Sequence, residues 1–192
     1  MLFRSALQLE NDLKTVLEKK QLTLYYQPIV FSKTGRLKGF EALIRWEHPF
    51  RGIISPSDFI PVAEDNGQII PIGQWVIETA CRQLKAWHDR FPDCEHLTIS
   101  VNISIQQFSH NNLEKIIETA LKDTGLAPHC FMAELTESAV IDNPEAVIGN
   151  LNRLKQSGIK IAIDDFGTGY FSLTYLKRSE EHTSELQSRQ SI

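Results

Sequence analysis

The second half of this 192-residue sequence alternates between two kinds of hydrophobic pattern. Apolar, β-rich runs at 97–103, 130–135 and 159–163 predict strands, and helical patterns at 111–122 and 144–156 lie between them. Neighbouring parallel strands need a long crossover, which a helix supplies, so this alternation indicates a parallel sheet. The pattern is compatible with a doubly wound sheet and with a (β/α) barrel.

The first half of the chain adds two strands and several helices. An amphipathic helix is expected over 7–20, and strands are expected over 22–30 and 37–46. Further helices are expected over 59–64 and 72–87. The whole chain is therefore predicted to be an α/β protein with five strands and no internal repeat.

Composition excludes several classes of protein. Apolar residues make up 42% of the chain and charged residues 23%, as in ordinary soluble domains, and the net charge is -4. Nonspecific DNA binding requires a strong basic excess, so we expect no DNA partner. The three cysteines lack CxxC spacing, and no stretch resembles a signal peptide or a membrane span. We expect a reduced, cytoplasmic domain, and membrane anchoring of a longer parent protein stays open.

Each of the last three predicted strands ends in a group of oxygen-bearing side chains. The groups are Asn102 with Ser104, Glu134 with Thr136 and Glu137, and Asp164 with Asp165, while the second strand carries Glu41 and Arg45. In parallel α/β folds the active site lies at the carboxyl ends of the strands. Carboxylates that meet there repel one another, and a divalent metal removes the conflict. An all-oxygen set of carboxylates and an amide suits magnesium or manganese rather than zinc.

Each of these residues also has a less specific interpretation. A single acidic residue at a strand end is more often a helix cap or a surface charge, but the repetition on four strands favours a shared site. Asp164 and Asp165 are adjacent, so both reach one site only if the strand ends at Asp164. The glycines within 166–169 would allow a turn there, although this segment alone is a weak phosphate-loop signal.

Other kinds of catalytic site are disfavoured. The six histidines have no HExxH-like spacing, which argues against a zinc peptidase. No serine or cysteine lies in a GxSxG motif, so covalent catalysis is not indicated. The three tryptophans are expected in the core or beneath a helix, not on a platform that stacks bases.

Several short motifs occur in the order that is found in one known family. They are Tyr26-Gln27-Pro28, Glu41-Ala42-Leu43 followed by Arg45-Trp46, PSDFI at 56–60, GQWV at 73–76, VNIS at 101–104, ELTES at 134–138 and DDFGTG at 164–169. Through these motifs, over residues 9–177, the chain resembles the EAL domain family. One three-letter motif would carry little weight, whereas this ordered set makes a chance resemblance implausible.

The resemblance implies a fold, a reaction and a cofactor. The family's fold is a modified TIM barrel, so this chain would form a partial TIM-like (β/α) barrel with about the first five of eight strands. The family's activity is hydrolysis of cyclic diguanylate (cyclic di-GMP) to linear pGpG. Cyclic di-GMP is therefore the expected partner, and Mg²⁺ or Mn²⁺ the expected cofactor.

The resemblance also implies a role for individual residues. The implied metal ligands are Glu41, Asn102, Glu134, Asp164 and Asp165. Glu137 would anchor the loop that carries Asp165, and the implied catalytic group is Glu41, Asp164, Asp165 and Glu137. The implied substrate-binding residues are Gln27, Leu43 and Arg45.

Three segments are expected along the chain. Residues 1–20 would be an N-terminal connector helix, and residues 21–177 an incomplete EAL domain, since the later family motifs do not occur. Residues 178–192 are expected to be a non-native tail, because RSEEHTSELQS resembles the translation of a common sequencing adapter. We use "parent protein" for the protein in which the barrel is complete, and we expect the 192-residue chain itself to be inactive.

Two classes of function stay open for the parent protein. One is an active phosphodiesterase, and the other is a degenerate EAL module that binds cyclic di-GMP or a partner protein without hydrolysis. A structural domain that binds no nucleotide is disfavoured by the intact acidic cluster. The N-terminal segment resembles a connector that follows a diguanylate cyclase, so an upstream cyclase or sensor domain is expected, and a homodimer stays open.

Overall fold

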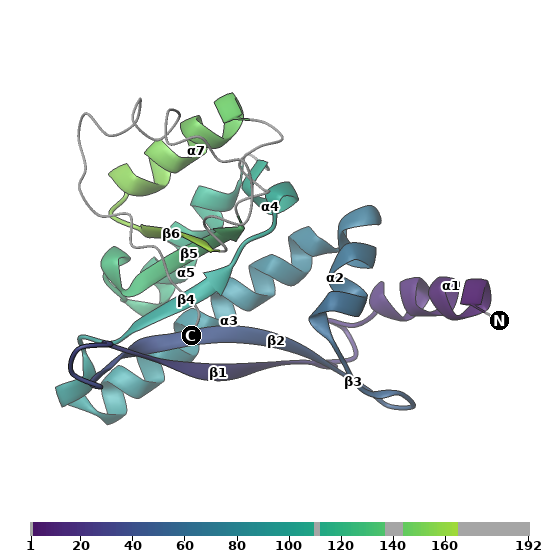
Figure 1. Cartoon of the computed structure of the whole chain (residues 1–192), viewed down its shortest axis with the longest axis horizontal. Coiled ribbons are helices and arrows are strands. Elements are labelled where there is room, and N and C mark those ends of the chain that lie inside the picture. The colour runs from purple at the N-terminus through teal and green to yellow at the C-terminus, as the bar shows by residue number, and fades with distance from the viewer. Residues whose placement is uncertain (1, 110–111, 137–143, 165–192) are drawn as a thin grey trace.

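One twisted six-stranded sheet organises the chain (Figure 1). The computed structural model describes residues 2–109, 112–136 and 144–164. Along the sheet the strand order is β1-β2-β4-β5-β6, with β3 paired to β2 off this path. The strands are β1 (Leu22–Val30), β2 (Leu37–His48), β3 (Gly52–Ile54), β4 (Thr98–Asn102), β5 (Phe131–Thr136) and β6 (Lys160–Asp164).

The predicted α/β fold with a parallel sheet is confirmed for most of the sheet. β2, β4, β5 and β6 run parallel to one another, and β1 and β3 pair with β2 in the antiparallel sense. Residues 31–36 alone join β1 to β2, and so short a turn can connect only antiparallel strands. Gly35, with φ 66°, closes this turn through its N–H to the carbonyl of Phe31. The short strand β3 was not predicted.

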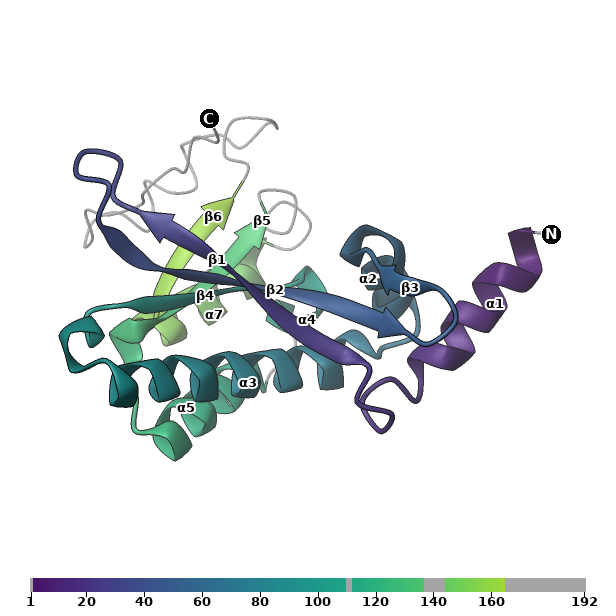
Figure 2. The ribbon, with the colours of Figure 1, turned by 90° about the horizontal axis from the view of Figure 1, so that it is seen from below.

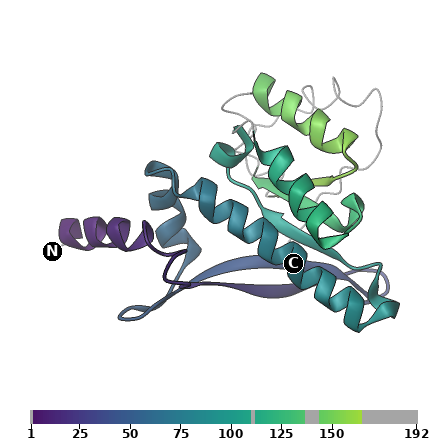
Figure 3. The same cartoon turned by 180° about the vertical axis from the view of Figure 1, so that it is seen from behind.

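Helices supply the crossovers between the parallel strands. The crossover helices are α2 (Pro56–Asp65), α3 (Ile69–Arg90), α4 (Ile105–Ser109), α5 (Leu113–Thr124) and α7 (Pro144–Gln156), with 3-10 turns at Pro92–Cys94 and Pro128–Cys130, whereas α1 (Leu2–Leu13) precedes the sheet. α3 and α5 cover one face of the sheet (Figure 2). Seen from behind, α3, α5 and α7 follow one another side by side (Figure 3). No helix among the described residues has the length and apolar character that a membrane span requires.

The first helix differs from its prediction. It ends at Leu13, and residues 14–20 form hydrogen-bonded turns instead of continuing the helix. Lys20 adopts a left-handed φ of 52°, and the N–H of Gln21 bonds back to the carbonyl of Val16. This closure turns the chain into β1 while Leu13 and Val16 stay buried. The amphipathic pattern over 7–20 therefore reports burial that continues past the end of the helix.

The core lies between the sheet and its helices. Its largest fully buried side chains include Trp46, Phe59, Phe108 and Phe131. Burial of each such side chain contributes about 1.5–3 kcal/mol. Trp46 also donates its Nε1–H to Oε1 of Gln21 at 3.2 Å, which ties the end of β2 to the segment before β1. The expectation that the tryptophans pack in the core or under a helix is confirmed.

Candidate active site

Strand register brings the predicted acidic positions to one face of the sheet. Glu41 pairs with Ser100, and two residues farther along β4, Asn102 pairs with Glu134 of β5. Alternate residues of a strand share a face, so Glu41, Asn102 and Glu134 lie on the same side at the carboxyl ends of β2, β4 and β5. The predicted gathering of these three residues is thus observed.

A hydrogen bond joins two of these strand ends. Nδ2 of Asn102 donates to Oε1 of Glu41 at 2.8 Å, across 61 residues of sequence. Glu41 is half-buried, Asn102 is exposed, and Glu134 is only 1% exposed. The bond to Glu41 uses only the amide nitrogen of Asn102. It does not occupy Oδ1, which is the atom that can bind a cation.

A cavity of about 470 Å³ opens beside these strand ends. Its walls come from β2, β4, β5, α2, α3 and the segment that follows β4. Four residues predicted from the sequence line it, namely Leu43, Arg45, Asn102 and Glu134. Two predicted substrate-binding residues and two predicted metal ligands therefore share one cavity, with the buried carboxylate of Glu134 in its wall.

The remaining predicted substrate residue lies next to Glu41. Gln27 of β1 is exposed and stands directly opposite Glu41 in the antiparallel register. It is therefore on the same face of the sheet as Glu41, Asn102 and Glu134, although it does not line the cavity.

Arg45 is held by two contacts of its own strand pair. Its guanidinium carbon lies 5.5 Å from the ring centroid of Tyr25, and its Nη1 donates to the carbonyl of Ile44 at 2.8 Å. A cation–π contact at a partly exposed site contributes about 0.5–1 kcal/mol. With most of its five donors left over, the Arg45 guanidinium can still bind a phosphate group. The sequence interpretation missed Tyr25 as the support for this arginine.

Glu64 is a second residue that the sequence interpretation did not assign to the site. It lies in α2, lines the cavity, and has a pKa raised by desolvation on burial and further raised by the neighbouring charge of Asp65. Only the arrangement of α2 over β2 reveals its place.

Several predicted site residues cannot be placed in this geometry. Asp165 and Glu137 lie outside the described residues. β6 is described as far as Asp164, whose backbone pairs with Thr136, two positions beyond the pairing of Glu134 with Ala162. The register therefore places the backbone of Asp164 at the carboxyl end of β6, beside the end of β5.

The side-chain oxygens of Glu41, Asn102 and Glu134 suit a hard divalent cation. Two carboxylates and an amide offer only oxygen ligands, which magnesium and manganese prefer. A buried carboxylate such as that of Glu134 is costly in an apolar surrounding, and a cation next to it offsets that cost. Among the described residues, no group of three or more His, Cys, Asp or Glu side chains is close enough to hold a metal. Further ligands are needed to complete the coordination, as the prediction for Asp164 and Asp165 requires.

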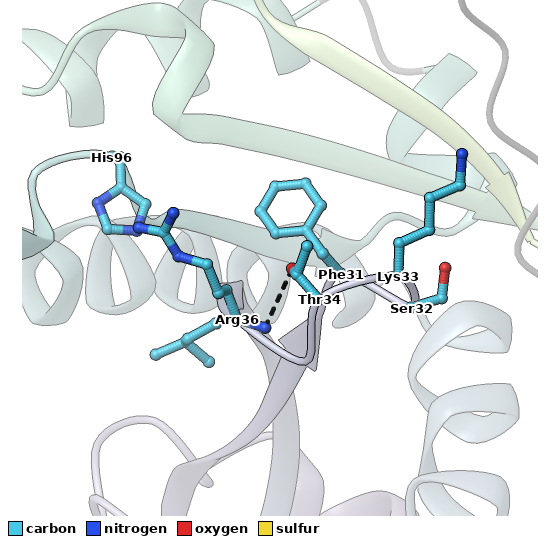
Figure 4. Close-up of a pocket in the computed structure, with 7 residues that line it drawn as sticks. Phe31, Ser32, Lys33, Thr34, Arg36 and His96 are labelled. Carbon is cyan, nitrogen blue, oxygen red and sulfur yellow. Dashed lines mark hydrogen bonds between the residues drawn. The ribbon is translucent and has the colours of Figure 1, made fainter.

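Another cavity lies at the other end of the strands. It measures about 520 Å³ and is formed by the β1–β2 turn and His96, just before β4 (Figure 4). Lys33, Arg36 and His96 give it a basic lining without any acidic residue, and Arg36 lies beside His96. Active sites of parallel α/β folds lie at the carboxyl ends of the strands, so this cavity at the amino ends is not the candidate site.

Comparisons of sequence and of structure with known proteins agree on one family. The EAL domain family matches residues 10–183. The bifunctional diguanylate cyclase/cyclic di-GMP phosphodiesterase MucR of Pseudomonas aeruginosa is 45% identical over 172 residues, which cover 90% of this chain and 25% of MucR. The cyclic di-GMP phosphodiesterase NbdA of the same organism is 41% identical over 173 residues, which cover 90% of this chain and 22% of NbdA.

The solved structures agree on the fold. The structure of the PaMucR phosphodiesterase in complex with c-di-GMP has a TM-score of 0.84, with 45% identity, covering 89% of this chain and 68% of that one. The chain spans about a quarter of the length of MucR and of NbdA. The likeness confirms the predicted partial TIM-like barrel. With its ordered motifs, its strand register and this family match over most of its length, the chain belongs to the EAL domain family.

Proposed function

We propose that the parent protein hydrolyses cyclic di-GMP to linear pGpG with Mg²⁺ or Mn²⁺. One observation carries the proposal: the Asn102–Glu41 hydrogen bond joins two oxygen-bearing side chains at the strand ends, and Asn102, buried Glu134 and Arg45 line one cavity there. Relatives named as cyclic di-GMP phosphodiesterases, and a related phosphodiesterase structure with c-di-GMP bound, support this choice of substrate. EAL phosphodiesterases as a family depend on divalent metal.

The proposed metal ligands are Glu41, Asn102, Glu134, Asp164 and Asp165. When bound, two divalent ions supply an activated water and neutralise charge on the phosphodiester during in-line displacement. The water oxygen forms a new bond to phosphorus while one phosphodiester P–O bond breaks, which opens the ring to the linear dinucleotide. Glu137 is proposed to anchor the segment that carries Asp165.

The nucleotide is proposed to be held by the chain's own polar side chains. Arg45 presents a guanidinium whose position is fixed by Tyr25 and by the carbonyl of Ile44, so it loses little freedom when it pairs with a phosphate oxygen. Leu43 offers an apolar surface in the same cavity, and Gln27 offers an amide beside Glu41. This division between charge, apolar contact and amide is usual for ligand cavities.

The 192-residue chain by itself is proposed to be inactive. β1 and β6 are the two ends of the sheet path among the described strands, and unpaired strand edges invite aggregation. A catalytic site without its full ligand set also lacks the fixed geometry that in-line attack requires. Residues 1–20 are proposed to act as a connector to an upstream cyclase or sensor domain. Residues 178–192 are proposed to contribute nothing, so deleting them should leave solubility and thermal unfolding unchanged.

The test is hydrolysis of cyclic di-GMP by the parent protein with Mn²⁺, followed by chromatography of the linear product. We expect turnover by the parent and none by residues 1–192. Tight binding of cyclic di-GMP without any turnover would replace the proposal with the degenerate-module alternative. Turnover by the 192-residue chain, together with a cooperative unfolding transition, would refute the claim that the barrel must be completed.

A further inference from the structure

The segment that follows Asn102 begins a short helix with a reciprocal pair of hydrogen bonds. The N–H of Gln107 donates to Oγ of Ser104 at 3.3 Å, and the N–H of Ser104 donates to Oε1 of Gln107 at 3.0 Å. This is the capping box of an S-x-x-Q sequence, with Ser104 as N-cap of α4 (Ile105–Ser109). The two bonds fix the backbone two residues after the proposed metal ligand.

Gln107 is also fixed from the side by α3. Its side chain is only 6% exposed, and it packs directly on Gly73 of that helix. A Cβ atom placed on residue 73 would overlap with Nε2 and Cδ of Gln107. Gly73 has an ordinary helical backbone and no turn to make, so the close approach of Gln107 is the structural reason for a glycine at this position.

Asn102 depends on this arrangement because its own side chain is exposed. Packing does not hold an exposed side chain, so the orientation of Asn102 is set by its bond to Glu41 and by the backbone around it. On the far side of Asn102, the N–H of Ile103 donates to the carbonyl of Glu134 at 2.8 Å. The next residue, Ser104, is held by the capping box. The hydrogen bonds of Ile103 and Ser104 thus fix the backbone next to Asn102, and this backbone determines where Oδ1 of Asn102 points.

We propose that Gln107 is a positioning residue for the divalent-metal site, acting through the backbone of residues 102–104, and that Gly73 provides the space in which it does so. This inference rests on the proposed function for the role of Asn102 as a ligand. Gln107 does not itself touch the metal. Gln107 bonds to Ser104 rather than to a ligand, so its loss should weaken metal binding by no more than the lower end of the about 10–100-fold range for groups bonded directly to a ligand.

The first test measures Mn²⁺ binding to the parent protein by electron paramagnetic resonance of the free ion, in the absence of nucleotide. We expect Gln107→Ala to raise the apparent Kd for Mn²⁺ by about tenfold, which is the lower end of the range for outer partners. Gln106→Ala is the matched control, because Gln106 is the adjacent residue of the same helix and is exposed. It should leave the Kd unchanged. Gln107→Glu keeps an acceptor for the N–H of Ser104, and it should restore most of the affinity.

A double-mutant cycle then tests whether Gly73 acts through Gln107. Gly73→Ala alone should weaken Mn²⁺ binding about as much as Gln107→Ala does, because the added methyl displaces the Gln107 amide. In the Gln107→Ala background the clash is gone, so the second substitution should leave the Kd unchanged. There it should also raise the thermal midpoint, because alanine is a better helix residue than glycine.

A merely structural role for Gln107 predicts a different set of results. Ile117→Val in α5 is a control for destabilisation, since Ile117 is fully buried in a helix that does not line the cavity. It should lower the thermal midpoint and leave the Kd for Mn²⁺ unchanged. If Gln107→Ala behaves like Ile117→Val, or if the Gly73 and Gln107 effects on the Kd simply add, the inference is wrong.

The inference and the proposed function fail in distinguishable ways. A parent protein that binds Mn²⁺ with the expected Gln107 dependence but does not hydrolyse cyclic di-GMP would overturn the proposed hydrolysis and support the positioning role. A parent protein that hydrolyses cyclic di-GMP with an unchanged Kd in the Gln107→Ala variant would do the reverse. If the Asn102→Ala variant binds Mn²⁺ with the wild-type Kd, Asn102 is not a ligand, and the positioning role of Gln107 is wrong as well.

Discussion

Trp87 should contribute more to stability than the other tryptophan of the same helix. Its ring lies 4.9 Å from that of Tyr26 at an interplanar angle of 76°, and 4.6 Å from that of Phe40 at 43°. Each such pair contributes about 0.5–1.5 kcal/mol beyond the burial of area. Truncation of a large core aromatic costs about 3–5 kcal/mol, and Trp87 is half-buried, so we expect Trp87→Ala to cost about 3 kcal/mol.

Trp75→Ala is the matched control for this substitution. Trp75 is also half-buried in α3, and within the described part of the chain it has no aromatic ring contact. Trp87→Ala should therefore destabilise the parent domain by about 2 kcal/mol more than Trp75→Ala, from the two lost ring pairs. For a domain of this family's size, that difference is a midpoint about 4–8 °C lower in thermal unfolding followed by far-UV circular dichroism. Equal midpoints for the two variants would refute the assignment of the extra stability to the ring contacts.

Three further predictions concern the site, the thiols and the pH dependence. Glu41→Ala should abolish hydrolysis by the parent protein and weaken Mn²⁺ binding, and wild-type turnover in this variant would exclude the proposed ligand role. In the native state a thiol reagent should label half-buried Cys94 first, because Cys81 and Cys130 are buried and burial raises the pKa of both thiols, that of Cys81 to about 12. Burial also raises the pKa of Tyr26 from 10.0 to about 12. The unfolded chain therefore loses this proton first, so stability to urea should fall as the pH rises through this interval, and less steeply in Tyr26→Phe.

Long elements with a clear period were predictable from the sequence. The five strands on the main sheet path are apolar runs, and the crossover helices α5 and α7 carry apolar residues at helical spacing, so the hydrophobic pattern indicated both kinds of element. β3 was missed because it has only three residues, and α4 because five residues are little more than one helical turn, too short to show a helical period. α4 is fixed by the two hydrogen bonds of its capping box, and these produce no hydrophobic period in the sequence.

The predicted site shows the same division. Glu41, Asn102 and Glu134 were predictable because each is a polar residue on an apolar strand. Glu64 and Gln107 lie on helices, where acidic and amide side chains are ordinary, so only the packing of α2 and α3 around the cavity gives them a role. Sequence patterns thus identify polar residues on apolar strands, and they miss polar residues on helices whose role depends on packing against other elements.

The stagger of the predicted ligand positions carries the last piece of evidence that the open sheet belongs to a barrel. From Glu41, the next ligand position lies two residues farther along at β4, level at β5 for Glu134, and two residues farther again at β6 for Asp164. In a flat sheet these positions would drift along the strands and separate. In a barrel of eight strands with a shear of about 8, the strands tilt so that one level around the axis advances by about one residue per strand. Three steps would then advance about three residues, and positions on one face differ by even steps, so the observed total of four is within one residue of the barrel value and keeps the four positions close to one level. The residues that we propose as metal ligands are therefore aligned by the tilt of the strands, and a sheet with this tilt needs further strands to close into a barrel.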